Sequence, residues 1–166
     1  MPKTTPADFS ELSHRVADLG EICLRADRAH FRMVWVVGGT AAERSALLRG
    51  FAEATAGELI ELGKGLSAAL IDVSASLRAA SVEDCFARLL EDRPGPILCL
   101  DHLEILFEPS LRLNPVELLK NSSRHRLLVA SWPGTIQGDR ITFGPEEHPA
   151  HRKYFHQEME CQFLLL

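Results

Sequence analysis

The stretch MVWVVGGTAAERSALLR, residues 33–49, decides the fold, because it joins an apolar run to a glycine pair and then to an amphipathic segment. Residues 33–37 are all apolar, which is typical of a strand buried on both faces of a sheet. Gly38 and Gly39 predict a tight turn after that strand. The periodic apolar residues that follow predict a helix over 44–56, closed by Gly57.

The turn is similar to a phosphate-binding loop with two altered positions. Such a loop reads glycine, four residues, glycine, lysine and then serine or threonine; its backbone N–H groups surround phosphates, and its hydroxyl holds Mg²⁺. Gly38 and Ser45 occupy the outer positions here, whereas Glu43 replaces the second glycine and Arg44 replaces the lysine. Gly39 and Thr40 complete the candidate cofactor-binding loop with them.

Two interpretations of this loop stay open. In the first, Arg44 still pairs with ATP, but a Glu43 carboxylate about 4 Å from a phosphate opposes binding by up to roughly 4 kcal/mol at an effective dielectric of 20. In the second, the glycines make only a strand-to-helix turn, and Glu43 stabilises the positive N-terminus of the helix. The second is favoured, and ATP with Mg²⁺ is the alternative ligand.

A second acidic element lies in ILCLDHLEILF, residues 97–107. Asp101 ends an apolar strand, as does the aspartate that helps to hold Mg²⁺ in phosphate-loop enzymes, so Ser45 and Asp101 form the candidate metal pair. His102 stands where hydrolysing enzymes often carry glutamate, and it is either a base or a surface histidine. Ser131, after the apolar run 127–130, either senses a terminal phosphate or starts a turn.

The remaining chain reads as alternating helices and strands. Helices are expected at 8–29 (amphipathic, with Ser10 as N-cap), 67–70, 81–90 and 115–121; strands at 58–62, 97–100 and 127–130; a loop at Gly63 and Gly65; helix or strand at 103–107; a hairpin around 137–139; and an irregular tail at 144–166. This alternation predicts one α/β domain, 1–166, with a mainly parallel sheet covered on both faces. Ligands of such sheets lie beyond the carboxyl ends of the strands.

Composition and sequence pattern argue against several classes of function. The net charge of −5 argues against general binding to nucleic acid through its phosphates. No apolar run approaches the ~20 residues that span a bilayer, and the N-terminus lacks the apolar core of a signal peptide. No membrane partner is therefore expected, and the four scattered cysteines fit a reduced, cytoplasmic protein. Three histidines lack familiar zinc spacing, and solvated side chains are expected at His148, His151 and His156.

A basic cluster precedes the third apolar run and consists of Lys120, Arg124, His125 and Arg126. These side chains either satisfy the end of a helix or face phosphate or an acidic partner. A DNA-associated adaptor acting through Lys120, Arg124 and Arg126 is therefore one hypothesis.

The segments LDHLEILFEPSLRLNPVELLKNSSRHRLLVASWPG, residues 100–134, and GPEEHPAHRKYF, residues 144–155, resemble the BrxF family, the small P-loop proteins of type III BREX phage-defence systems. The resemblance covers about residues 30–155. It implies a compact, three-layer P-loop NTPase fold and a bacterial cytoplasmic role beside a large ATPase, a methyltransferase and a phosphatase-like protein. The chain departs from the family's loop at Glu43 and Arg44.

Three functions are therefore expected in order of preference. The first is a non-catalytic or weakly active interaction and regulatory subunit that docks on other BREX proteins, especially the large ATPase. The second is a slow ATPase using Arg44, Ser45 and Asp101. The third is the DNA-associated adaptor, with DNA contacted only within the complex; self-association is left open.

Overall fold

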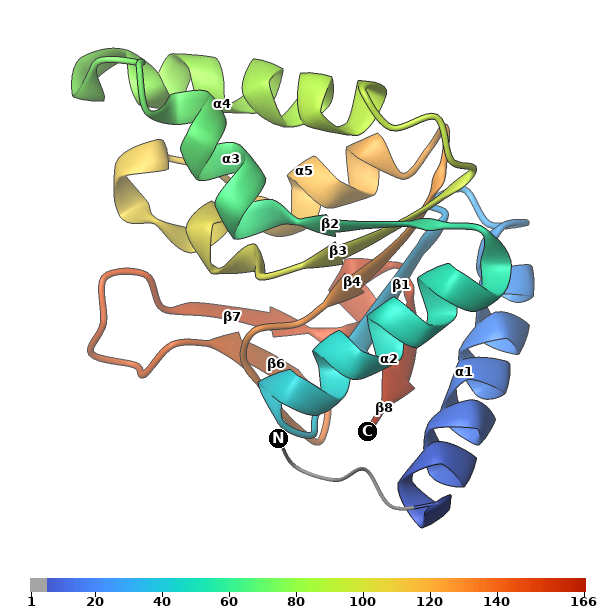
Figure 1. The fold of residues 1–166 in the computed structure, drawn as a ribbon. Helices are drawn as coiled ribbons and strands as arrows, with labels where there is room; N and C mark the ends of the chain where they lie inside the picture. The colour runs from blue at the N-terminus through green and yellow to red at the C-terminus, as the bar shows by residue number, and fades with distance from the viewer. Residues whose placement is uncertain (1–5) are drawn as a thin grey trace.

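A computed structural model describes residues 6–166, and side chains from Ser10 onward. Its centre is a parallel sheet with the strand order β2-β3-β4-β1-β8 (Figure 1). The strands are β1 (Met33–Val37), β2 (Glu58–Glu61), β3 (Ile97–Asp101), β4 (Leu127–Ser131) and β8 (Gln162–Leu165). The predicted α/β class with a mainly parallel sheet is confirmed.

Helices cover both faces of this sheet (Figure 1). One core cluster joins β1 through Val34 and Val36 to helices α1 (Pro6–Ala26) and α2 (Ala41–Thr55). The other joins β1 through Trp35 to α3 (Leu62–Leu70), α4 (Ala75–Glu91) and α5 (Pro115–Ser122). Alternate residues of β1 thus enter opposite cores, which explains why the strand is apolar throughout.

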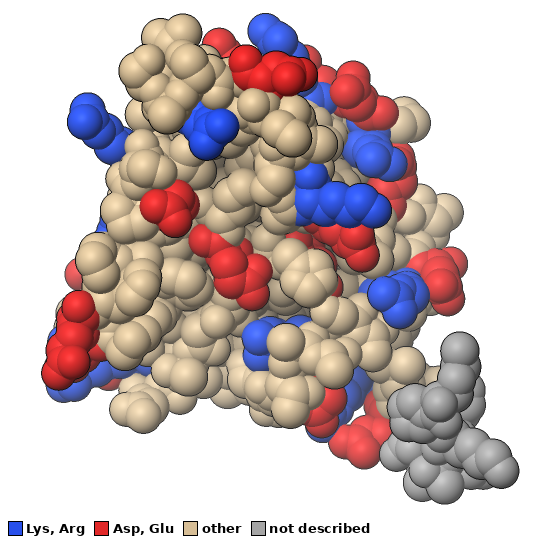
Figure 2. All heavy atoms as spheres, turned by 60° about the vertical axis from the view of Figure 1, so that its left-hand side comes forward, with Lys and Arg blue, Asp and Glu red and all other residues tan. Residues whose placement is uncertain are grey.

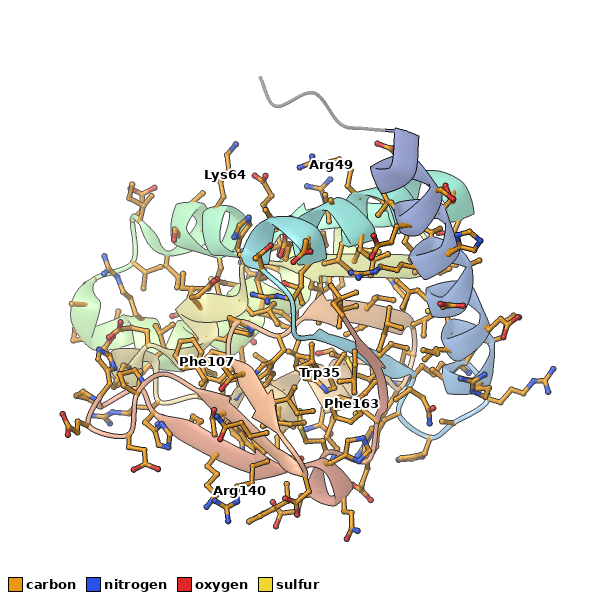
Figure 3. All side chains as sticks on the ribbon, turned by 90° about the horizontal axis from the view of Figure 1, so that it is seen from below. Trp35, Arg49, Lys64, Phe107, Arg140 and Phe163 are labelled. Carbon is orange, nitrogen blue, oxygen red and sulfur yellow. The ribbon has the colours of Figure 1, made fainter. Side chains whose placement is uncertain are left out.

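A small antiparallel sheet contributes to the second core. It contains β5 (Thr135–Gln137), β6 (Arg140–Phe143) and β7 (Arg152–Phe155), and Gly138 provides the left-handed turn of the predicted hairpin. Trp132 anchors this sheet, because its Nε1–H donates to the Thr142 carbonyl at 2.9 Å and its ring meets Trp35 edge-on at 5.2 Å. Figure 3 shows Trp35, Phe107 and Phe163 within the body of the fold, with Arg49 and Lys64 at its margin.

Several predicted helix boundaries were wrong. Helix α1 includes Ser10, so this residue is not the N-cap. Helix α2 begins at Ala41 rather than near Arg44, because Thr40 caps it, and its left-handed C-cap is Ala56 rather than Gly57. Helix α4 likewise starts six residues earlier than the predicted residue 81. Residues 103–107 form the short 3₁₀ helix η1 (Leu103–Phe107), and a second, η2 (Pro109–Leu111), follows.

Two segments predicted to be irregular are regular. The expected loop at Gly63 and Gly65 belongs to α3, where a Cβ on Gly63 would lie 3.2 Å from the His102 carbonyl and one on Gly65 about 3.0 Å from Leu89. These glycines therefore permit close packing. The tail at 144–166 contains β7, the 3₁₀ helix η3 (His156–Met159) and β8. No helix within residues 6–166 is long and apolar enough to cross a bilayer.

Candidate functional site

The carboxyl ends of β1, β3 and β4 bring most predicted site residues together. Strand β4 lies between the other two, so the end of β4 bridges the glycine turn and the acidic strand end. The Ser45 hydroxyl donates to Asp101 Oδ2 at 2.5 Å, and the Ser131 hydroxyl donates to Oδ1 at 2.6 Å. Asp101 is only 5% exposed, so its carboxyl group joins the end of β3 to α2 and to the end of β4 inside the protein.

The glycine turn is closed by a helix cap. Gly38 and Gly39 have φ values of 87° and 55°, which turn the chain so that Thr40 becomes the N-cap of α2. The Thr40 hydroxyl accepts from the Glu43 N–H at 3.2 Å, and the Glu43 carboxylate accepts from the Thr40 N–H at 2.7 Å. This is a reciprocal capping box. The Thr40 backbone bond, followed by its hydroxyl bond, lowers the pKa of Glu43.

Arg44 is drawn back onto the turn. The residue is only 8% exposed, and its Nη1 donates to the carbonyls of Gly38 at 2.8 Å and Gly39 at 3.1 Å. Its Nε is buried and finds no acceptor within residues 6–166. The guanidinium thus fixes the carbonyl side of the turn but keeps one unsatisfied donor.

The end of β8 covers the glycine turn. The Leu166 N–H donates to the Val37 carbonyl at 2.8 Å. A Cβ placed on Gly38 would lie 2.8 Å from the Leu166 oxygen, and one on Gly39 would lie 3.1 Å from the Leu166 Cβ. Sequence reasoning missed this residue, because nothing in the apolar tail indicated where it would pack. Leu166 therefore packs directly against the glycine turn.

His102 lies beside Asp101 in an unusual backbone conformation. Its φ is 57°, and its N–H donates to Asp101 Oδ1 at 3.0 Å. Its imidazole is half-exposed, with Nε2 3.6 Å from Asp101 Oδ2. The left-handed residue ends β3 and starts η1, so the chain turns away before Glu104, which is exposed. His102 therefore adjoins the predicted metal pair as a partly solvated group.

The residues present do not fit a nucleotide phosphate chain in this arrangement. The N–H groups of Thr40 and Glu43 already have acceptors, and an acidic side chain lies among them. Ser45 and Asp101 have the chemistry of a Mg²⁺ pair, but they bind each other. The buried Nε of Arg44 is a donor at the turn that an added acceptor would satisfy. No catalytic step follows from this geometry.

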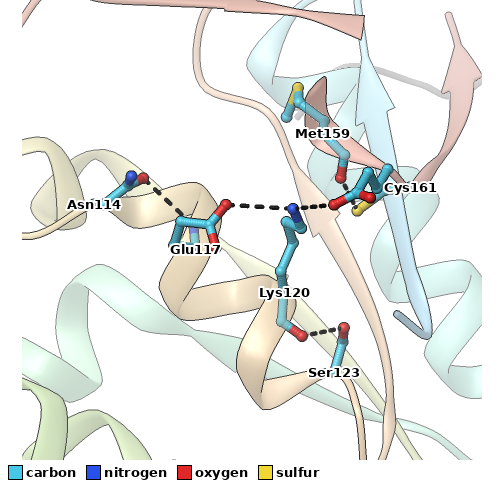
Figure 4. Close-up of polar contacts among 7 residues, drawn as sticks. Asn114, Glu117, Lys120, Ser123, Met159 and Cys161 are labelled. Atoms are coloured by element: carbon cyan, nitrogen blue, oxygen red, sulfur yellow. Dashed lines mark hydrogen bonds and ion pairs between the residues drawn. The ribbon is translucent and has the colours of Figure 1, made fainter. Parts of the chain in front are cut away.

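The basic cluster is largely occupied by intramolecular contacts. Lys120 is 3% exposed, and its Nζ lies 2.8 Å from Glu160 and 3.3 Å from Glu117 (Figure 4). Burial lowers the pKa of Lys120, but the bonds to Glu160 and Glu117 outweigh it, so the pKa is raised. Lys120 and Arg124 also lie over the Phe31 ring, at 4.6 and 5.4 Å. The ion pair with Glu160 joins α5 to the segment leading into β8.

The remaining polar candidates have local roles. Arg126 donates to the carbonyls of Leu90 and Arg93. His148 accepts from the Ala150 N–H, His151 bonds to the Gly144 carbonyl, and His156 stacks on Phe163. In the described part of the chain, no group of three or more His, Cys, Asp or Glu side chains could hold a metal ion, and all four cysteines are free.

The face shown in Figure 2 carries basic and acidic side chains scattered among uncharged ones. It therefore presents no broad field of one sign that would attract a polyanion.

The chain matches no protein-family model, no curated protein and no solved structure.

Proposed function

We propose that this chain is a non-catalytic interaction module with a P-loop-like fold, in which the former nucleotide contacts have become structural. The observation that carries this proposal is the capping box: the Glu43 carboxylate accepts the Thr40 N–H in the turn where a phosphate would otherwise be held. The Glu43 carboxylate thus lies at the positive N-terminus of α2, where an anionic ligand would otherwise bind.

The P-loop assignment is supported by the placement of chemistry on the sheet. A glycine turn follows β1, a serine lies in the first turns of α2, and an acidic residue ends β3. Ser45, Asp101 and Ser131 meet by hydrogen bonds although they lie on three elements. Such convergence is what a Mg²⁺–nucleotide site requires.

The proposed setting is a bacterial type III BREX system, where the chain docks on the large ATPase in the cytoplasm. The support is the resemblance of residues 100–134 and 144–155 to the BrxF family. Co-expression of the tagged chain with the other BREX components tests this setting. We expect the ATPase to co-purify in a fixed ratio, and a chain that retains none of the components would refute the docking.

Calorimetry with ATP and Mg²⁺ tests the non-catalytic proposal directly. We expect no saturable heat at nucleotide concentrations up to about 1 mM, which corresponds to a binding free energy weaker than about −4 kcal/mol. Asp101→Ala provides the matched control for any heat observed. Saturable binding by the native chain that Asp101→Ala abolishes would overturn the proposal.

A slow ATPase is the second candidate, and the buried Arg44 Nε without an acceptor favours it. Opening of the turn would let this donor reach a phosphate oxygen. The double variant Glu43→Gly, Arg44→Lys restores the usual loop residues and removes the cap. Recovery of MgATP binding by this variant alone would show that only the loop has changed, whereas turnover by the native chain would establish the ATPase.

A further inference from the structure

The two edges of the parallel sheet differ in their protection. On β2, Glu58 accepts from the Gly95 N–H at 2.7 Å and lies 3.9 Å from Arg93, and Glu61 adds a second charge to the same edge. β8 and its two flanking residues, 161–166, read CQFLLL and contain neither a charged side chain nor a proline. Charges and prolines are the usual means by which edge strands avoid pairing with other chains. The β8 edge lacks both.

The outward backbone groups of β8 can be identified from its pairing with β1. Leu166 donates its N–H to Val37, so it faces β1. Since successive residues of a strand point their N–H and C=O to opposite sides, Leu164 also faces β1, whereas Phe163 and Leu165 face away. The outward backbone groups of Phe163 and Leu165 make no backbone hydrogen bond within residues 6–166. The Leu165 side chain is 61% exposed.

We propose that a second copy of this chain pairs along β8, antiparallel, across a two-fold axis at Leu164. In this register Phe163 lies opposite Leu165 of the second copy, and the two outward residues of each strand form hydrogen-bonded pairs. The two five-stranded sheets become one continuous sheet through β8. Figure 1 shows β8 at the margin of the sheet, beyond β1. This dimer does not depend on whether the chain binds a nucleotide.

The chemistry of the edge favours a second copy as the occupant. An isologous interface needs a self-complementary surface, and this register places an aromatic ring opposite a leucine twice. Each chain carries a net charge of −5, but the paired strands bring no charged residue of residues 161–166 together. The acidic residue that precedes this stretch in sequence, Glu160, is already paired with Lys120. Hydrogen bonding and apolar contact therefore act where no like charges of residues 161–166 face each other.

Sedimentation analysis of the full chain over a concentration series tests the dimer. Leu165→Pro removes an outward N–H that the dimer needs and leaves the bonds from Leu164 and Leu166 to β1 intact. Leu165→Lys places a like charge on both sides of the two-fold axis. Each variant should weaken dimerisation about ten- to a hundredfold. The control Ile71→Lys changes an equally apolar residue, 71% exposed, that lies away from β8 and should leave the dimer unchanged.

A second measurement keeps the test informative if Leu165→Pro fails to fold. Hydrogen exchange should show the Phe163 and Leu165 amides becoming protected as concentration rises, while the Leu164 amide stays protected throughout. A chain that remains monomeric up to several hundred micromolar, on the order of the weakest stable dimers, overturns the proposal. So does a dimer that Leu165→Lys leaves intact, because its interface then lies elsewhere.

Discussion

The turn after β1 and the network at the ends of β3 and β4 satisfy their polar groups in different ways. In the turn, Thr40 bonds to Glu43 three residues away, and Arg44 reaches Gly38 six residues away. In the network, Asp101 accepts from Ser45, 56 residues away, and from Ser131, 30 residues away. The turn is therefore built by local sequence, whereas the network exists only when the sheet is assembled.

Burial separates these two regions as clearly as sequence distance does. Thr40 and Glu43 are exposed, so water can replace their mutual bonds. Asp101 and Ser131 are buried, where a lost partner leaves a polar group without water. We infer that the network contributes more to stability, while the turn decides whether an anion can enter.

The largest expected effect is that of Asp101→Ala. This change leaves the Ser45 and Ser131 hydroxyls and the His102 N–H without their acceptor, and it should lower the free energy of unfolding by about 2–4 kcal/mol. Urea denaturation at neutral pH measures the loss. Asp101→Asn should cost less, because the amide still accepts from one serine and donates to the other. A loss below about 1 kcal/mol for Asp101→Ala would show that the network is not structural.

The fold was predictable wherever a strand was apolar and bounded by glycine, proline or charge. Residues 33–37 were predicted to the residue as β1, and the hairpin around 137–139 was also confirmed. The region from residue 144 was not, because β8 is short and becomes a strand only by pairing with β1. Such tertiary pairing overrides the weak local signal of a four-residue segment.

The candidate site was predictable in its members but not in its contacts. Alternation of strands and helices placed Ser45, Asp101 and Ser131 at one edge of the sheet, and the structure joins them. The start of α2 was missed by three residues, although Thr40 and Glu43 carry the spacing of a capping box. A phosphate loop depends on which residue stands at position 43, whereas a capping box depends on the spacing between Thr40 and Glu43.

An intermediate effect is expected from Arg44→Met, which keeps much of the apolar stem but removes the donors to the Gly38 and Gly39 carbonyls. The loss should be about 2 kcal/mol, since bonds from a charged donor are stronger than neutral ones. Arg44→Lys should lower the free energy of unfolding by less than Arg44→Met does, because one ammonium replaces the planar guanidinium. Arg49→Met, an exposed position on the same helix, serves as the control in the same denaturation series. Equal losses at positions 44 and 49 would contradict the bracing role of Arg44.

The smallest effect is expected in the cap itself. Thr40→Ala should cost about 1 kcal/mol, the usual contribution of an N-cap side chain. Glu43→Gln should reduce stability only at higher pH. The pKa of Glu43 is lowered in the folded chain, so its contribution is present above the unfolded value of about 4.3 and is lost as pH falls through the lower folded value. Denaturation midpoints between about pH 3 and 7 test this sign.

The Glu43→Gln variant also separates the effect of the carboxylate on stability from its effect on anion binding. Glu53→Gln, an exposed glutamate on α2, controls for general charge loss. If Glu43→Gln is less stable than the native chain only above the folded pKa of Glu43, the carboxylate contributes as an anion at the N-terminus of α2. If the stability difference from the native chain persists unchanged at low pH, that electrostatic role is wrong. MgATP affinity measured on Glu43→Gln then shows whether the charge alone excludes phosphate, because Leu166 still covers Gly38 in this variant. If neither the native chain nor Glu43→Gln binds MgATP, the closed shape of the turn would account for the exclusion.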